Sequence, residues 1–133
     1  MIRYLLDTNA VISLLNSVNS PAAIKARQMD PREVGMSAIV AHELFYGAFK
    51  SARPTQNVAL VDTLQFEIVE FDTEDARRAG EVRAYLAKRG TPIGPYDVLI
   101  AGQALARGLI LVTHNLGEFG RVPALQIEDW TAV

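Results

Sequence analysis

The sequence contains no cysteine among its 133 residues. This absence excludes disulfide bonds, metal sites built on thiolates and cysteine nucleophiles, and it is compatible with a reducing compartment. A surplus of positive charge is also missing, because 13 Lys and Arg face 15 Asp and Glu and leave a net charge of −2. Proteins that coat nucleic acids non-specifically depend on excess Lys and Arg, so this activity is not expected here. A small basic patch is still compatible with the balance.

Long apolar runs are absent as well. The longest uninterrupted ones are four residues, as in Val98–Ala101 and Leu109–Val112, whereas a membrane-spanning helix needs about 20. The opening segment reaches the charge of Asp7 too early for a signal peptide. We therefore expect a cytoplasmic protein with no membrane partner. Half of the residues, 50%, are hydrophobic, which is too many for a disordered chain and suits one domain over residues 1–133.

Short apolar runs alternate with segments of helical periodicity. The expected strands span residues 2–6, 34–36, 66–71 and 109–112, with 126–127 as an edge strand. The expected helices span residues 8–16, 21–29, 38–50, 54–64, 73–89 and 95–107. We expect Ser37 and Thr73 to cap the start of two of them, and Gly90 and Gly108 to end two. Strands that alternate with helices predict a three-layer α/β/α domain with a mainly parallel central sheet.

Three carboxylates stand in apolar surroundings. Asp7 follows a buried strand, Glu43 lies on a helix among uncharged neighbours, and Asp97 directly precedes an apolar run. A buried carboxylate is costly unless it is paired or bound to a metal. Each also has an ordinary explanation: a helix N-cap for Asp7, exposure or pairing with a nearby base for Glu43, and the helix dipole for Asp97. Other acids, Asp75 and Glu118 among them, occupy turns or helix starts where solvent is expected.

The three acids would converge if the first and fourth strands were neighbours. Asp7 ends the first strand, Asp97 opens the helix before the fourth, and Thr113-His114-Asn115 follows it. In parallel sheets ligands bind beyond the carboxyl ends of the strands. Carboxylates without thiolates or several histidines favour a hard cation, Mg²⁺ with Mn²⁺ as a substitute. The expected chemistry is metal-assisted attack of water on a phosphodiester.

Four motifs, in this order and at these spacings, resemble PIN-domain ribonucleases. They are Leu5–Asn9, the Glu43 helix with Tyr46-Gly47, Gly94–Asp97 followed by Ile100-Ala101, and Val112–Asn115 with Glu118-Phe119. The chain is most similar to the VapC toxins of bacterial type II toxin–antitoxin pairs. This resemblance implies a PIN-like fold and a Mg²⁺-dependent endoribonuclease that inhibits translation and growth until a VapB-type antitoxin neutralises it. The form of the Gly94–Asp97 motif is similar to VapC toxins that cut initiator tRNA.

The resemblance also implies the roles of individual residues. It assigns Asp7, Glu43 and Asp97 to catalysis and to the metal, and it places Asn115, which has no charge, at the fourth acidic position. Thr8, Asn9 and Thr113 are expected behind these residues as hydrogen-bond partners of Asp7 or Asn115. The candidates for RNA contact are Lys88, Arg89, Tyr96 and His114, although basic side chains on a helix are more often simply solvated.

Partners follow from the resemblance too. It implies a homodimer, to which Leu44, Phe45, Tyr46 and Phe49 could contribute, and contact with operator DNA only through the antitoxin. Three alternatives remain open on sequence grounds. They are a phosphatase with Asp7 as nucleophile, a non-catalytic binding module on the same fold, and a related nuclease that cuts DNA. A phosphatase of that kind usually needs a second acid two residues further on, where this chain has Asn9.

Overall fold

The computed structural model describes residues 1–131. Its strands are β1 (Tyr4–Leu6), β2 (Val34–Ser37), β3 (Glu67–Val69), β4 (Ile110–Val112) and β5 (Ile127–Glu128). Its helices are α1 (Thr8–Asn16), α2 (Pro21–Gln28), the 3₁₀ turn η1 (Pro31–Glu33), α3 (Ala38–Phe49), α4 (Pro54–Asp62), α5 (Thr73–Lys88), α6 (Pro95–Arg107) and α7 (Leu116–Phe119). The short elements η1 and α7 were not expected from the sequence.

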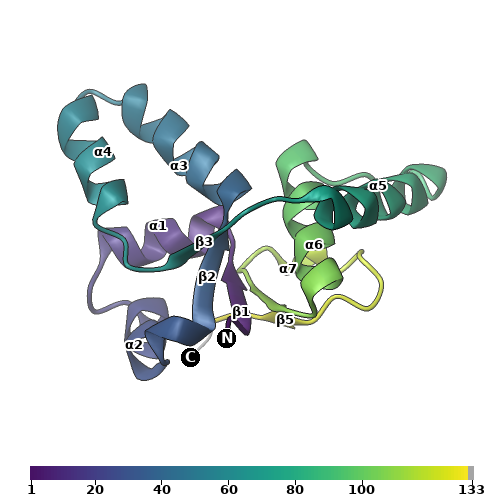
Figure 1. Cartoon of the computed structure of the whole chain (residues 1–133), viewed down its shortest axis with the longest axis horizontal. Coiled ribbons are helices and arrows are strands. Elements are labelled where there is room, and N and C mark those ends of the chain that lie inside the picture. Colours follow the sequence, from purple (N-terminus) through teal and green to yellow (C-terminus); the bar gives the residue numbers. More distant parts are fainter. Residues whose placement is uncertain (132–133) are drawn as a thin grey trace.

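The sheet is parallel throughout the described chain and has the order β3-β2-β1-β4-β5. Leu6 at the end of β1 lies beside Met36 of β2 and Val112 of β4. Helices α1 to α4 lie on one side of the sheet and α5 and α6 on the other (Figure 1). The expected three-layer α/β/α architecture is therefore confirmed. The strand order reverses at β1, so the carboxyl ends of β1 and β4 form the switch point where such sheets bind ligands.

Local sequence signals explain most element boundaries. Ser37 accepts a hydrogen bond from the Ile39 amide and starts α3. Gly108, with a φ of 64°, ends α6 in the left-handed conformation that favours glycine. The expected cap at Thr73 is wrong, because the capping residue is Asp72. Its carboxylate accepts from the Asp75 amide, and the Asp75 carboxylate accepts from the Asp72 amide, which satisfies two backbone donors reciprocally.

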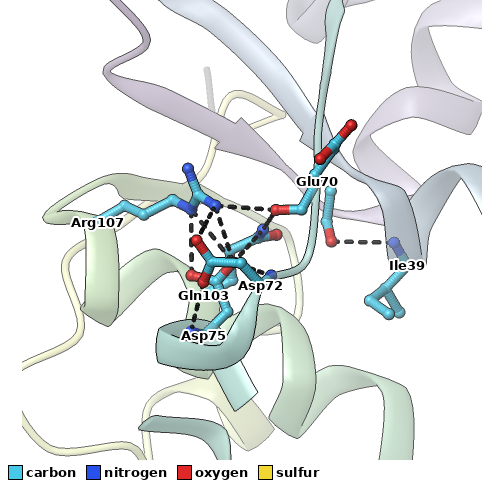
Figure 2. Close-up of polar contacts among 7 residues, drawn as sticks. Ile39, Glu70, Asp72, Asp75, Gln103 and Arg107 are labelled. Carbon is cyan, nitrogen blue, oxygen red and sulfur yellow. Dashed lines mark hydrogen bonds and ion pairs between the residues drawn. The ribbon is translucent and has the colours of Figure 1, made fainter. Parts of the chain in front are cut away.

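A buried acid ties the two helices on the second side of the sheet to each other. Asp75 is 1% exposed, contrary to the expectation of solvent contact. Its carboxylate accepts hydrogen bonds from Gln103 and Arg107, and both of these side chains also donate to the Glu70 carbonyl (Figure 2). Burial alone would raise the pKa of Asp75, but the bonds from Arg107, the Asp72 amide and Gln103 outweigh it and lower that pKa. This network fixes the start of α5 against the end of α6.

The same two helices touch backbone to backbone at Gly102. A Cβ built on Gly102 would lie 2.4 Å from the Ala79 Cα, so only a hydrogen atom fits at this crossing.

The strands of the sheet supply much of the hydrophobic core, in which Leu5, Leu6 and Leu111 are fully buried. No helix within residues 1–131 has the length and apolar character needed to cross a membrane.

Candidate active site

Asp7 lies at the switch point, directly after β1. Its side chain is almost completely buried, and one oxygen accepts a hydrogen bond from the Ala10 amide at 2.8 Å, so Asp7 caps α1. Burial raises the pKa of Asp7, and the negative charges of Glu43 and Asp129 raise it further. Hydrogen bonds from Thr113 and the Ala10 amide oppose this shift. The cap therefore fixes the rotamer of a carboxylate that is held in an unfavourable electrostatic position.

Glu43 faces Asp7 from α3. Its Oε1 accepts a hydrogen bond of 2.8 Å from the Thr8 hydroxyl. Thr8 was expected to bind Asp7 or Asn115, and that expectation is wrong because its partner is Glu43. The two nearby bases have other contacts: the Lys50 ammonium lies 4.8 Å from the centre of the Tyr46 ring, and His42 meets Tyr96 edge to face. An ion pair with His42 or Lys50 therefore does not explain why Glu43 lies among uncharged neighbours.

Asp97 has a strongly raised pKa. It lies in the first turn of α6 and is half-buried. Burial, followed by the negative charges of Glu118 and Glu43, raises the pKa of Asp97 from 3.8 to about 6. Asp7 contributes in the same direction. The carboxylates of Asp7, Glu43 and Asp97 are therefore close enough to repel one another. This agrees with the expectation that the acids converge if the first and fourth strands are neighbours, as β1 and β4 are.

Glu118 joins this group, although the sequence placed it in solvent. Asn115 caps α7 by accepting from the Glu118 amide, and its Nδ2 donates to Glu118 Oε2 at 2.8 Å. The Asn115 amide in turn donates to the hydroxyl of buried Thr113 at 2.9 Å. Asn115 thus holds a carboxylate beside Asp97 instead of supplying one. An Asn followed three residues later by Glu is a helix-start pattern that could have indicated this arrangement.

The donor set suits a hard cation. Within residues 1–131, no three His, Asp or Glu side chains are grouped tightly enough to surround a metal ion by themselves. The site nevertheless offers only oxygen donors, and their repulsion would be relieved by positive charge. Mg²⁺ keeps several of its waters and needs only one or two direct carboxylates. The residues therefore fit a hydrated Mg²⁺ or Mn²⁺ by their chemistry.

The other predicted residues are more dispersed. Tyr96 adjoins Asp97 and is 45% exposed. His114 is exposed, and its Nδ1 lies 2.9 Å from Asp129 Oδ2. Lys88 and Arg89 stand at the end of α5, where the Arg89 guanidinium covers the Tyr85 ring. Asn9 is exposed. Among the bonds of the described residues, none joins the Asn9 side chain to Asp7 or Asn115, where we expected it to bind.

Comparison with known proteins shows the family of the chain. Residues 4–125 match the PIN domain. The chain belongs to the PIN-domain family. Within that family it is 44% identical to the tRNA(fMet)-specific endonuclease VapC of Salmonella typhimurium, over 98% of this chain and 99% of that protein. It is 39% identical to the Shigella flexneri protein of the same name, over 98% of this chain and all 100% of the relative.

A solved structure agrees with the sequence relatives. The crystal structure of DNA-bound VapBC from Salmonella typhimurium contains a chain that superposes on this PIN domain with a TM-score of 0.91 and 42% identity. The match covers 98% of this chain and 99% of that one. The expected resemblance to VapC proteins is therefore confirmed over nearly the whole length.

Proposed function

We propose that this PIN domain is a Mg²⁺-dependent endoribonuclease that acts as a toxin of the VapC type. The observation that carries the proposal is the meeting of four carboxylates at the switch point, in a chain with VapC ribonucleases as full-length relatives. Carboxylates gathered at such an edge serve phosphodiester hydrolysis with a bound divalent ion. We propose that residues 1–133 act as one nuclease domain.

In this proposal Asp7, Glu43 and Asp97 hold the ion, with Glu118 beside them. When bound, Mg²⁺ supplies positive charge to the phosphate and lowers the pKa of a water. The protein contributes the positioning. The Ala10 amide and Thr113 fix Asp7, the Thr8 hydroxyl fixes Glu43, and Asn115 Nδ2 fixes Glu118. Such supporting hydrogen bonds orient the carboxylates before substrate arrives.

We propose initiator tRNA as the substrate, because the Salmonella and Shigella relatives are named as tRNA(fMet)-specific endonucleases. Loss of initiator tRNA would stop translation and growth. The Salmonella structure contains VapBC on DNA, which supports a VapB-type antitoxin as the neutralising partner and as the route to operator DNA.

We also propose a homodimer. Of the four residues that the sequence suggested for it, Leu44 is taken up by the core and Phe45 is half-buried. Tyr46 and Phe49 are 59% and 66% exposed and are available for a second copy. Sedimentation of the isolated chain, with Phe49→Asp as the variant, tests this contact. A dimer that is unchanged by Phe49→Asp would place the interface elsewhere.

Replacing Asp7 by Asn tests the activity. Asparagine keeps the oxygen that accepts from Ala10 and removes the charge, so we expect an intact fold and a loss of RNA cleavage on the order of 100-fold or more. The measurement is sequencing of RNA ends after expression, combined with cleavage of purified tRNA in vitro, where 5′-phosphate products are expected. Asp62→Asn, which changes an exposed acid at the end of α4, is the matched control.

The other candidate functions give different results in the same assay. Full activity of Asp7→Asn would overturn the proposal. Hydrolysis of small phosphoesters without RNA cleavage would point to a phosphatase. Metal binding without turnover of any RNA or DNA would point to a binding module, and cleavage of DNA alone would point to a DNA nuclease.

A further inference from the structure

A cavity of about 600 Å³ lies between α1, α2 and residues 129–131. Its lining includes Thr113 and Asn115, which touch the acidic site from the other side through Asp7 and Glu118. The cavity therefore adjoins the proposed site of cleavage, and Thr113 and Asn115 belong to both. Its volume is within the range of about 300–1,000 Å³ that is typical of small-molecule sites.

The inner walls of the cavity are apolar. Leu6, Ala22, Val112 and Trp130 form them and are almost completely buried, and the half-buried Leu14 lies beside them. Trp130 is held in place by two contacts: its ring meets Tyr4 edge to face, and its Nε1 donates to Glu128 at 3.0 Å. An apolar wall of this kind favours a ligand with a flat, apolar ring, because contact between the ring and the wall removes apolar surface of both from water.

The mouth of the cavity is polar and carries both donors and acceptors. His114 Nδ1 lies between Asp129 Oδ2 at 2.9 Å and the Thr131 hydroxyl at 3.0 Å. This leaves Nε2 of the exposed His114 ring without a protein partner within the described residues. The Asn9 amide and the Ser13 hydroxyl complete the mouth. A nucleobase has this combination, with apolar faces and an edge of hydrogen-bond donors and acceptors.

We propose that the cavity binds the base of a nucleotide next to the scissile phosphate, turned out of the RNA stack. The inference rests on the proposed function and adds a contact that selects the sequence or shape of the RNA. Because Thr113 and Asn115 belong to both sites, a phosphate at the carboxylates would place the adjoining base within reach of the cavity. Proteins that recognise RNA sequence mostly bind the unstacked bases of single-stranded loops, bulges and ends, because these bases can be turned out at little cost.

Trp130 gives the experiment a built-in reporter, because the chain has a single tryptophan. Its indole N–H yields one resonance in a proton–nitrogen correlation spectrum of the full chain. The probes are the four nucleoside 5′-monophosphates, and ribose 5-phosphate is the base-free control. We expect at least one nucleotide to shift the Trp130 indole and the Asn9 and Asn115 resonances to saturation, while ribose 5-phosphate leaves the indole unchanged.

Two variants test the cavity itself. Ser13→Phe places a ring in it, and His114→Ala removes a polar group from its mouth without disturbing the core. We expect both to weaken the nucleotide-dependent shift at least fivefold and to lower kcat/KM for RNA. Ile68→Phe, at the exposed far edge of the sheet in β3, is the matched control and should leave both unchanged.

The outcomes separate this inference from the proposed function. Equal shifts with ribose 5-phosphate, or unchanged nucleotide binding in both Ser13→Phe and His114→Ala, would overturn the base site while leaving nuclease activity intact. A shift of the Trp130 indole resonance on addition of an antitoxin peptide, but with none of the nucleotides, would also overturn the base site and assign the cavity to a protein partner. A base-dependent shift in a protein that cuts no RNA would count against the proposed function alone.

Discussion

Asp97 combines a place in the candidate site with an electrostatic cost to the fold. Its pKa rises from 3.8 to about 6 in the folded chain, chiefly through burial and then through Glu118 and Glu43. Between these two pH values the folded protein binds more protons than the unfolded chain. The free energy of unfolding therefore falls as the pH rises through this window, and the stability lost there stays lost at neutral pH.

Asp97→Asn removes this cost. Without metal at pH 7.5, we expect the variant to melt about 2–5 °C above the wild type, because a neutral amide replaces a repelled carboxylate. The difference should shrink as the pH falls from about 6 to 3.8, where the wild-type carboxyl gains its proton. Thermal melting across this range, with Asp62→Asn alongside, checks the prediction. An offset that is the same at every pH would mean that the charge of Asp97 is not its origin.

Glu118 is the residue at which sequence reasoning and the site differ most. Its carboxylate lies beside Asp97 and is oriented by Asn115 Nδ2. For Glu118→Gln we expect kcat for RNA cleavage to fall about 10- to 100-fold, which is the usual effect of removing a group that supports a metal site. Glu81→Gln, on the exposed face of α5, is the control. Activity within twofold of the wild type would limit the Glu118 carboxylate to holding Asn115, the residue that caps α7.

At the scale of elements, the boundaries that the sequence predicted correctly are those with a strong local signal. Ser37 before α3, Pro21, Pro54 and Pro95 at helix starts, and Gly108 after α6 all act through their immediate neighbours in the chain. The parallel order of the strands was predicted by their alternation with helices. Signals of this kind need no tertiary structure, and for that reason they can be read from one sequence.

What the sequence did not predict depends on contacts between distant segments. The burial of Asp75 follows from Gln103 and Arg107, which come from the next helix. The place of Glu118 in the site follows from α7, a helix of only 4 residues with too short a pattern to detect. The three acids could be predicted because an isolated carboxylate in an apolar run is conspicuous without knowledge of its partners.

The contact between α5 and α6 allows a sharp test at this scale. Gly102→Ala would place a methyl group 2.4 Å from the Ala79 Cα, and the backbone cannot retreat as a flexible side chain could. We expect a loss of about 1–3 kcal/mol in the free energy of unfolding, typical of overpacking, and lower activity because α6 carries Asp97. Denaturant titration measures the loss.

Gly80→Ala is the matched control for that variant. Gly80 lies on α5, and a methyl group added there would meet no atom within 4 Å outside its own helical turn. We expect this change to stabilise the protein by about 0.5–1 kcal/mol, because alanine is the better helix residue. Equal effects of the two substitutions would show that the helices do not depend on close approach at Gly102.

For the whole molecule, binding of the proposed cation and folding should be linked. An ion that binds only the folded chain adds about 2.7 kcal/mol to the free energy of unfolding at 100 times its Kd. We therefore expect Mg²⁺ and Mn²⁺ to raise Tm by several degrees, a chelator to reverse the change, and Asp7→Asn to abolish most of it. Sodium chloride at matched ionic strength is the control. A rise in Tm of the same size in Asp7→Asn would mean that the ions act by screening charges over the whole protein and not by binding at the site.

The pairing of Leu6 with Val112 has a consequence for the order in which the chain is made. β1 is synthesised first, yet β4, one of its two neighbours, is synthesised near the end. The same is true of Thr113, which helps to hold Asp7, and of Asn115, which holds Glu118. While the ribosome is still translating the middle of the message, Asp7 has neither β4 nor Thr113 for support. The acidic site can therefore be completed only when most of the chain has left the exit tunnel. The arrangement of the strands thus delays assembly of the candidate site until the end of synthesis.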